Sequence, residues 1–416
     1  MAVDTISDAI NAESRSDEDA STMMSVSFDG VSKSTLEQVT PREVILGESL
    51  LTPGLQTSII FDSYIHNYPP KDFSELKNKS VSISISKPSL YNYGLPTDLE
   101  VVQTVYRMDN RSLVNNNNER FTIRACDQTQ LDDPKSLVSH SWKCTSPSEV
   151  VSYVLSNCLG AASMKIEASD YPRDYIAENI HPFQIVQQQT NYACAAGSDP
   201  SFLHYMTYEN YGTHNFRSLY GLTRQGSIMD YQFNETGSVF AQPFSILRYS
   251  FPCDFDILSD ALNGIDEYGN NINSVILLNP ADKTFSFFNQ DFDPLGCGIG
   301  SGVMKVAISN QNTAERQDMC PDYSQYFLQN RQARMGLISK DKITLRMMVP
   351  FNPKLNVGKI VNVILPNKEA APNVELNFGS GEYLILHMFH HIINGGMATT
   401  TMDLVAKTSG LKGSPF

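Results

Sequence analysis

The chain has 416 residues, a net charge of −14 and 18% charged residues, a composition that argues against a nucleic-acid-binding protein. Such proteins need clustered Lys and Arg to displace counterions from phosphates. The length exceeds what one hydrophobic core supports and predicts about two to four domains. Acidic residues near the start (Asp4, Asp8, Glu13) argue against a signal peptide, and no apolar run approaches the roughly 18 residues of a membrane span.

The cysteines show no metal-binding or redox spacing. There are seven, with no Cys-x-x-Cys pair, at positions Cys126, Cys144, Cys158, Cys194, Cys253, Cys297 and Cys320. The odd count and irregular spacing predict reduced thiols from a cytoplasmic assembly environment, with a disulfide framework as the alternative.

The N-terminal segment differs from the rest of the chain. Residues 1–43 are rich in Ser and acidic residues, and Met23, Met24, Val26 and Phe28 form their main apolar group. Such a segment cannot form its own core. It predicts an acidic arm that is either disordered or ordered against a neighbouring subunit.

Residues 44–145 show the period-two apolar pattern of antiparallel strands with one buried face. The predicted strands cover residues 44–46, 55–61, 81–85, 99–108 and 120–125. So many short strands in about 100 residues indicate a first tube-like β-barrel.

Residues 146–235 predict a helix-plus-hairpin domain. Ser146 is a predicted N-cap, followed by Pro147 at the first helical position and by Glu149 for a capping box, and Gly160 ends the helix. A second helix is predicted to start at Pro182 and to precede two strands, at 201–208 and 214–219.

The C-terminal part regains the period of two. The turn-rich residues 236–340 are assigned to a mixed region that includes part of a second barrel, and residues 341–408 to the second tube-like β-barrel, before a tail at 409–416. Its predicted strands cover 342–349, 359–365, 382–393 and 399–405, with residues 394–396 (Asn-Gly-Gly) as a hairpin turn. The predicted fold is therefore α+β but mainly β, with two antiparallel barrels, a helix-containing insert and a mixed peripheral region.

Two groups of residues resemble ligand sites only superficially. His387, His390 and His391 are close in sequence, and His387 and His391 share a face in a strand, but zinc needs further ligands from elsewhere. The alternating glycines of residues 296–302 lack the Lys-Ser or Lys-Thr of a phosphate-binding loop and predict a flexible loop or a bulge. The sequence thus predicts no metal and no cofactor.

Carboxylate pairs give no firm sign of catalysis. Asp254 with Asp256, and Asp291 with Asp293, are neighbours beside prolines, which is typical of turns rather than of two groups spaced across a sugar. Neither a Gly-x-Ser-x-Gly nor a His-Glu-x-x-His motif occurs. We therefore predict no catalytic residues and no enzymatic activity.

Three stretches resemble a known family. Residues 48–85, which include LLTPGLQTSIIFDSYIHNYPPKDFSELKNKSVSISI, resemble the opening of baseplate hub proteins of contractile-tailed bacteriophages, and residues 101–106 and 121–125 resemble the later strands of that barrel. A second match lies within residues 202–222, at Phe202, Tyr208, Glu209, Gly212, Phe216, Ser218 and Leu219. Residues 357–361 and 381–385, with His390 and Ile392, look like the last strands of the second barrel. The resemblance runs in order over most of residues 45–408, but not over the acidic start or the middle region.

This resemblance implies a homotrimer in which two similar barrels per subunit form a six-barrel ring, joining a sixfold tail tube to a threefold central spike. The implied partners are the tail tube protein, the central spike protein, the tape-measure protein and the baseplate wedge proteins. DNA would pass through the channel without specific binding, helped by acidic charge if that charge faces inward. The implied location is the virion tail baseplate, assembled in the host cytoplasm.

Two alternatives stay open at this point. One is a tip protein of a non-contractile tail or related injection machine, and the other is a peptidoglycan hydrolase. The chain lacks the valine-glycine repeats of type VI secretion spikes and a lysozyme-like segment, so the resemblance implies a hub separate from its spike.

Overall fold

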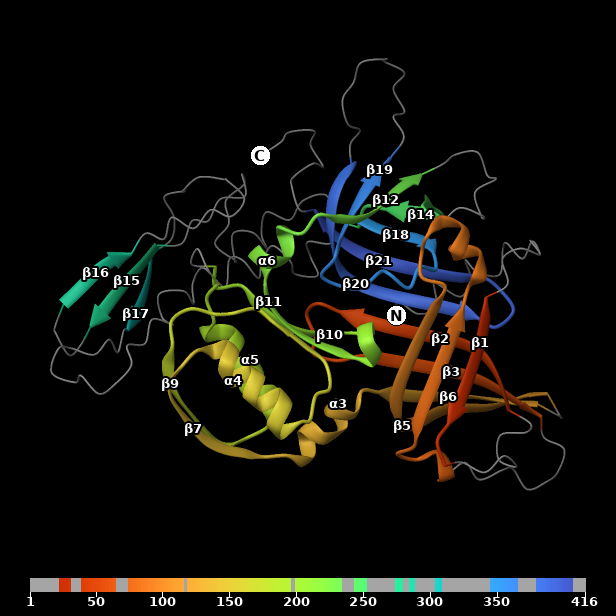
Figure 1. The fold of residues 1–416 in the computed structure, drawn as a ribbon, viewed down its shortest axis with the longest axis horizontal. Helices are drawn as coiled ribbons and strands as arrows, with labels where there is room; N and C mark the ends of the chain where they lie inside the picture. Colours follow the sequence, from red (N-terminus) through yellow and green to blue (C-terminus); the bar gives the residue numbers. More distant parts are fainter. Residues whose placement is uncertain are drawn as a thin grey trace, which may run out of the picture.

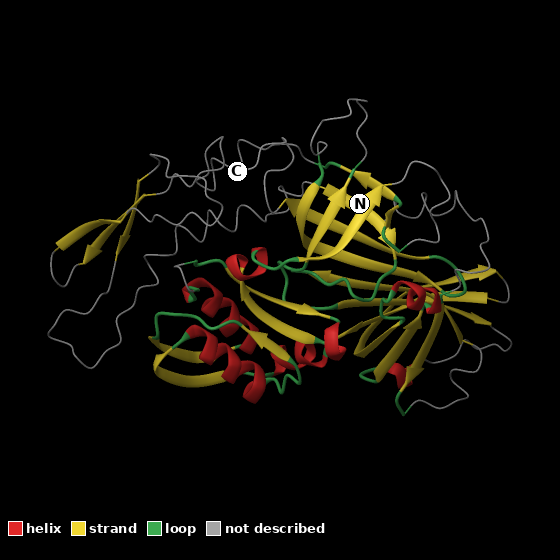
Figure 2. Ribbon diagram, turned by 45° about the horizontal axis from the view of Figure 1, so that its top comes forward, coloured by secondary structure: helices red, strands yellow, loops and turns green. Residues whose placement is uncertain are grey.

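A computed structural model of the protein shows a mainly β architecture with few helices (Figures 1 and 2). It describes residues 22–30, 39–64, 74–115, 118–195, 199–233, 243–252, 274–279, 284–288, 304–308, 345–365 and 379–406. A strongly curled sheet of 13 strands dominates these ranges, and small sheets accompany it. Within the same ranges, no helix combines the length and the apolar character needed to cross a membrane.

The first half of the large sheet is an antiparallel series in the order β1-β4-β5-β6-β3-β2. Its strands are β1 (Met23–Phe28), β4 (Ser80–Ser86), β5 (Asp98–Asn115), β6 (Asn118–Cys126), β3 (Gln56–Tyr64) and β2 (Val39–Ser49). The alternation predicted from the sequence is confirmed: in β4 the valine and both isoleucines are buried while the serines between them are partly exposed. Short 3-10 helices, η1 (Ser74–Leu76) and η2 (Pro88–Tyr93), flank β4.

The second half of the sheet closes on itself. Its order is β14-β18-β21-β20-β19-β12-β13, and only Leu247 separates β13 from β14. The strands are β12 (Ser227–Phe233), β13 (Ser245–Ile246), β14 (Arg248–Ser250), β18 (Leu345–Pro350), β19 (Ile360–Ile364), β20 (Gly381–Ile393) and β21 (Ala398–Ala406). β12 runs parallel to both β13 and β19, so the expectation of a purely antiparallel second barrel is wrong. The parallel pairs arise because β12 enters from the inserted domain and not from a neighbouring hairpin.

The two halves form one sheet and not two separate ones. The C-terminal part of β20 pairs with β2, from Glu43 opposite Ile393 to Ser49 opposite His387. The N-terminal part of β20 pairs instead with β19. β2 and β19 therefore diverge from the same edge of β20, and we call the point of divergence the fork. The predicted Asn-Gly-Gly turn is confirmed between β20 and β21, with Gly395 at φ 69°.

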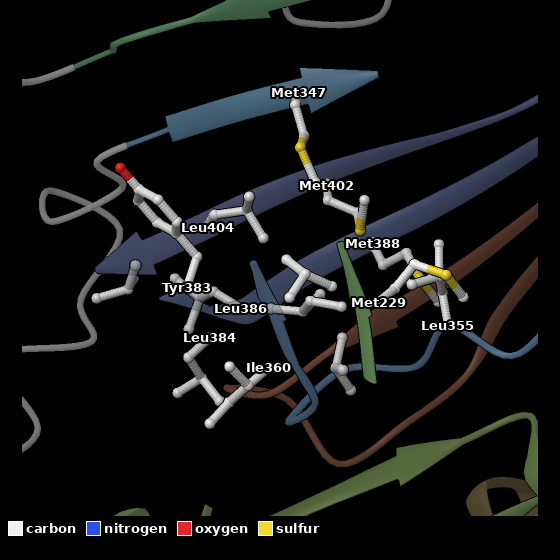
Figure 3. Packing of buried hydrophobic residues seen from close by; sticks show 14 of the residues in the cluster. Met229, Met347, Leu355, Ile360, Tyr383, Leu384, Leu386, Met388, Met402 and Leu404 are labelled. Carbon is white, nitrogen blue, oxygen red and sulfur yellow. The ribbon is translucent and has the colours of Figure 1, made fainter. Parts of the chain in front are cut away.

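Each half has its own hydrophobic core. The first contains the inward residues of β1 to β6, such as Ile59 and Ile123. The second contains Met347, Met388 and Met402 from adjacent strands (Figure 3). Leu90 and Leu95, from the connection between β4 and β5, belong to this second core. The first half thus supplies part of the second core, which ties the two halves together.

The inserted domain packs two helices between small sheets (Figure 2). It contains β7 (Val138–Thr145), α4 (Pro147–Tyr153), a π-helical turn η4 (Val154–Cys158), β8 (Met164–Ile166), β9 (Arg173–Ile180), α5 (Pro182–Tyr192), β10 (Phe202–Thr207), η5 (Glu209–Tyr211) and β11 (Thr213–Ser218). Short helices α3 (Gln128–Asp132) and η3 (Asp133–Lys135) lead in, and α6 (Leu219–Thr223) leads out. The predicted capping box of Ser146 and Glu149 is confirmed at the start of α4.

Strand pairing bears on three of the predicted domain limits, which otherwise remain predictions. β7 pairs with β9, so it lies with the insert and not with residues 44–145, while β12 lies in the second half of the large sheet. β1 was expected to belong to an arm but pairs along its whole length with β4 of the same chain. It can do so because Met24 and Phe28 reach the first core. Residues 1–21 lie outside the described ranges.

In the middle region, a separate sheet is formed by β15 (Ser274–Asn279), β16 (Thr284–Phe288) and β17 (Met304–Ile308). β15 and β16 are antiparallel, whereas β15 and β17 are parallel. Most of residues 236–340 lie outside the described ranges, so the mixed structure expected for this region stays a prediction.

The cysteines correct one expectation. Cys126, Cys158 and Cys194 are free, as predicted, but Cys144 is disulfide-bonded, so the expectation of reduced thiols is wrong at that position. Burial raises the pKa of the Cys126 thiol to about 12. That thiol is therefore protonated at neutral pH and a poor nucleophile.

Candidate functional site

Glu48 lies at the fork and joins three parts of the chain. It follows the buried Val44 and Leu46 on the inward face of β2 and is only 2% exposed. One carboxylate oxygen accepts a hydrogen bond from the Tyr208 amide of the insert at 2.6 Å, and the other accepts from the Val357 amide of the second half at 2.9 Å. The Tyr208 hydroxyl donates in turn to the Gln56 carbonyl at 2.9 Å. Glu48 thereby fixes the insert and the second half against β2.

Burial dominates the electrostatics of Glu48. Desolvation raises its pKa to about 8, although the amides of Tyr208 and Val357 act in the opposite direction and nearby Glu209 adds to the rise. A buried carboxylate without such donors would be far more costly. The fork therefore depends on two backbone donors that come from distant segments.

A chain of hydrogen bonds connects the insert to the end of β6. His204 Nε2 lies 3.1 Å from His214 Nδ1, and His214 Nε2 lies 3.1 Å from Thr129 Oγ1. The Thr129 hydroxyl donates to Asp127, the N-cap of α3, so its oxygen must accept from His214. His214 Nδ1 is then the acceptor for His204 Nε2–H. Both imidazoles are neutral, because burial lowers the pKa of His214 to about 4 and holds the pKa of His204 well below its usual range.

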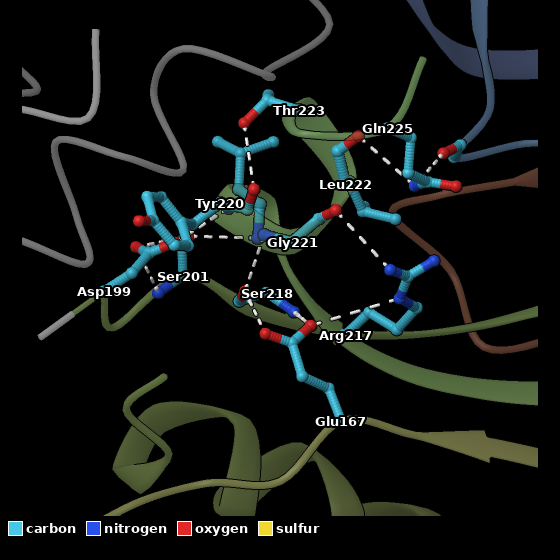
Figure 4. A network of polar contacts seen from close by, with 12 residues as sticks. Glu167, Asp199, Ser201, Arg217, Ser218, Tyr220, Gly221, Leu222, Thr223 and Gln225 are labelled. Atoms are coloured by element: carbon cyan, nitrogen blue, oxygen red, sulfur yellow. Dashed lines mark hydrogen bonds and ion pairs between the residues drawn. The ribbon is translucent and has the colours of Figure 1, made fainter. Parts of the chain in front are cut away.

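A second carboxylate network holds the exit of the insert (Figure 4). Asp199 accepts hydrogen bonds from the Ser201 hydroxyl and from the Tyr220 amide of α6, the latter at 2.8 Å. Glu167 accepts from the Ser218 amide at 2.9 Å and from its hydroxyl at 2.7 Å, and Ser218 caps α6 by accepting from the Gly221 amide. These bonds orient the segment that enters β12, so the insert is fixed at its entry, at its hairpin and at its exit.

One face of the large sheet continues across both halves. Directly opposite residues in a sheet share a face, so cross-strand rows can be followed from β5 through β6, β3, β2, β20, β21 and β18 to β14. The rows are Ser112–Arg120–Asp62; Asp109–Thr122–Ile60–Glu43–Ile393; Arg107–Arg124–Ser58–Ile45–His391–Thr399; Gln56–Gly47–Phe389–Thr401–Met348–Arg248; and Ser49–His387–Asp403–Arg346–Ser250. We call this surface the shared face. The opposite face carries the two cores.

The shared face is apolar at its middle and ion-paired on both sides. Phe389 is 43% exposed and lies over Gly47, where an added Cβ would come within 3.1 Å of its ring, so the glycine leaves room for the ring. Ile45 and Ile60, in the next two rows of the same face, are partly buried. Salt bridges flank this strip: those of Asp62 and Asp109 in the first half, and that of Asp403 in the second.

The three histidines noted in the sequence lie on the two opposite faces of β20, as the alternation of a strand requires. His390 is buried in β20, 2.7 Å from Thr400 Oγ1, and its pKa is lowered to about 3 by burial. His387 and His391 lie on the shared face, and His391 Nε2 is 3.3 Å from a Glu43 oxygen, which lowers the Glu43 pKa. In the described part of the chain, no three His, Cys, Asp or Glu side chains gather as metal ligands. Residues 254, 256, 291, 293 and 296–302 lie outside that part.

Comparisons with known proteins support the fold. No protein-family model matches the chain, and no curated protein matches its sequence. Its structure is similar to a tail protein of Neisseria meningitidis, with a TM-score of 0.55 and 11% identity over 92% of this chain and 96% of that one. It is equally similar to the 43 kDa tail protein of prophage MuSo2 from Shewanella oneidensis, with a TM-score of 0.55 and 8% identity over 94% and 98%. The chain thus has the fold of phage tail proteins, along nearly its whole length.

The sequence did not predict the contacts of Glu48 at the fork, nor the arginine–carboxylate salt bridges of the shared face. A signal for Glu48 was present, because strand alternation from Val44 and Leu46 places a carboxylate inward among apolar residues. Its two donors are 160 and 309 residues away, so their identity could not be read from spacing.

Proposed function

We propose that this chain is the structural hub of a contractile phage tail, a homotrimeric adaptor between the sixfold tail tube and the threefold central spike. The tail tube protein, spike protein and wedge proteins of the baseplate contact it, and the tape-measure protein and DNA pass through its channel. Its role is structural and not catalytic, and its place is the virion baseplate, after assembly in the host cytoplasm.

One observation carries this proposal: the shared face runs unbroken over two sets of four strands in one chain. β5, β6, β3 and β2 form the first set, and β20, β21, β18 and β14 form the second, each with a core behind it. Three chains would present six such sets, the number that a sixfold tube presents. Closed rings of identical chains are also the usual outcome of head-to-tail contacts.

The likeness to two phage tail proteins supports the same role, because it extends over more than nine tenths of this chain and of each of them. The hydrogen bonds at the fork, and those that fix the insert at its entry, hairpin and exit, suit a rigid adaptor. They hold the two halves of the large sheet and the insert in place relative to one another.

Light scattering of the purified full chain, with negative-stain images of the same sample, tests the proposal. We expect a mass three times the 46.3 kDa of one chain and a ring with a central hole. A stable monomer that forms no ring, even when mixed with tube and spike proteins, would overturn it. Zymography on peptidoglycan is the companion measurement, and clearing of the substrate would favour a hydrolase instead.

A further inference from the structure

The arginines of the shared face are held by carboxylates of the same face. Asp62 forms salt bridges with Arg120, at 2.8 Å between nitrogen and oxygen, and with Arg42 of β2, at 3.4 Å. Asp109 forms salt bridges with Arg124, at 2.8 Å, and with Arg107, at 3.1 Å. In the second half, both donor nitrogens of Arg346 bond the two oxygens of Asp403. Two carboxylates in the first half therefore hold two arginines each.

In the pairs made by Asp109 and Asp403, the two partners differ sharply in exposure. The side chains of Arg107, Arg124 and Arg346 are 63%, 41% and 50% exposed, whereas Asp109 and Asp403 are 14% and 11% exposed. The guanidinium groups thus lie at the surface, with the carboxylates beneath them. A polyanion that approached the face would meet the arginines first.

Stability alone does not account for this pattern. Exposed ion pairs contribute little to the free energy of folding, commonly about 0 to 1 kcal/mol. The other charged groups of this face are Glu43, which is shared by Arg42 and His391, and Arg248, which has no ion-pair partner among the described residues. Counted together, these groups are six arginines and four carboxylates, so the face carries +2 with neutral histidines, although the whole chain carries −14.

We infer that these carboxylates mask the arginines, so that the shared face does not retain double-stranded DNA that moves along it. The inference rests on the proposed function and takes the shared face to be the one that borders the DNA path. Free arginines would hold phosphates by releasing counterions, and a strongly acidic wall would oppose the entry of DNA. Arginines already paired with carboxylates have fewer free N–H donors for phosphates, and the face is not acidic. Ion-paired arginines on this face replace the acidic channel wall that the net charge first suggested.

The test removes the masking carboxylates without adding any cation. Asp62→Asn/Asp109→Asn changes the net charge from −14 to −12, since each substitution removes one negative charge. We expect the wild-type chain not to bind a fluorescent duplex of about 30 base pairs at low salt, and the double variant to bind it at least about tenfold more tightly. The logarithm of its binding constant should fall with the logarithm of salt with a slope of about −0.9 for each arginine that reaches a phosphate.

A matched variant separates masking from net charge. Asp132→Asn/Glu209→Gln also gives −12 and frees Lys135 and Lys165, which lie away from the shared face. We expect it to behave like the wild type. Adding Arg42→Gln, Arg107→Gln, Arg120→Gln and Arg124→Gln to the first double variant should abolish the DNA binding that it gained. Circular dichroism establishes that each variant is folded.

Two outcomes overturn the inference: a folded Asp62→Asn/Asp109→Asn variant that does not bind DNA, or equal binding by the matched variant. Light scattering on the same samples keeps the hub proposal separate. A ring whose unmasked variant does not bind DNA would refute masking alone. A monomer whose unmasked variant binds DNA would refute the hub alone.

Discussion

The two halves of the large sheet each contribute four strands to the shared face, but these strands are connected along the chain in different ways. In the first half, every pairing is antiparallel, and all six strands come from residues 23–126. In the second half, β12 and β13 precede β18 by a long stretch of chain, and β12 makes the two parallel pairings that lead to closure. The strand pairings within the first half therefore lie inside residues 23–126, whereas those of the second half join distant segments. The second half depends on the first half at the fork, where the Val357 amide donates to Glu48 of β2.

The largest expected effect comes from breaking the fork. Glu48→Ala leaves the buried amides of Tyr208 and Val357 without their acceptor, and each such loss costs about 1 to 3 kcal/mol. We expect the free energy of unfolding to fall by about 3 to 5 kcal/mol, measured by urea denaturation. Glu48→Gln keeps the size and one acceptor and should cost less. Equal stability of Glu48→Ala and the wild type would show that the fork does not hold the halves together.

Glu48 also predicts a pH dependence. Its pKa is raised from 4.5 to about 8 in the folded chain. Its contribution to stability is then fully present below about pH 4.5 and is lost as the pH rises through 8. We expect the wild type to lose stability between pH 5 and 9 relative to Glu48→Gln, which has no group to ionise there. Parallel pH profiles for the two proteins would contradict this assignment.

Core truncations test whether the two halves unfold together. Ile59→Ala in the first core and Leu386→Ala in the second remove fully buried side chains, and each should cost about 2 to 5 kcal/mol. Because Leu90 and Leu95 of the first half lie in the second core, we expect one calorimetric transition that both variants lower. Two separate transitions, each shifted by one variant only, would make the halves independent domains.

On acidification, the insert should lose stability at a higher pH than the large sheet does. The His214 pKa is lowered to about 4, so the stability gained from the neutral imidazole is present above pH 6.5 and is lost as the pH falls toward 4. The single tryptophan, Trp142, lies in the core of the insert and reports on it by fluorescence. We expect its emission to change at a higher pH than the far-ultraviolet dichroism of the sheet. His214→Gln should shift that change to lower pH, and an unchanged midpoint would exclude the histidine chain as its cause.

The smallest effect is expected at the start of α4. Ser146→Ala removes the side chain that accepts from the Glu149 amide, and loss of such a cap costs about 1 kcal/mol. Since the cap is local to the insert, the change should appear in Trp142 fluorescence and leave the transition of the sheet in place. A shift of the sheet transition by a similar amount would show that the insert and the sheet are more tightly coupled than we infer.

The sequence alone determined the local elements. The alternation of Ser80–Ser86 specified a half-buried strand, and Ser146, Pro147 and Glu149 specified a helix start, because both signals depend on residues within one turn or one strand. The separation of His390 from His387 and His391 followed from the same two-residue period. The mainly β class and the resemblance to tail hubs could also be stated from these patterns.

Only the tertiary structure decided how these elements pair. The recruitment of β1 and β7, the parallel β12, the donors of Glu48 and the arginine pairs of the shared face all join residues that lie far apart in the chain. Apolar alternation shows that a strand has a buried face, but it carries no information about which strand lies beside it. That choice depends on the total burial and hydrogen bonding of the whole sheet, so it appears only once the chain has folded.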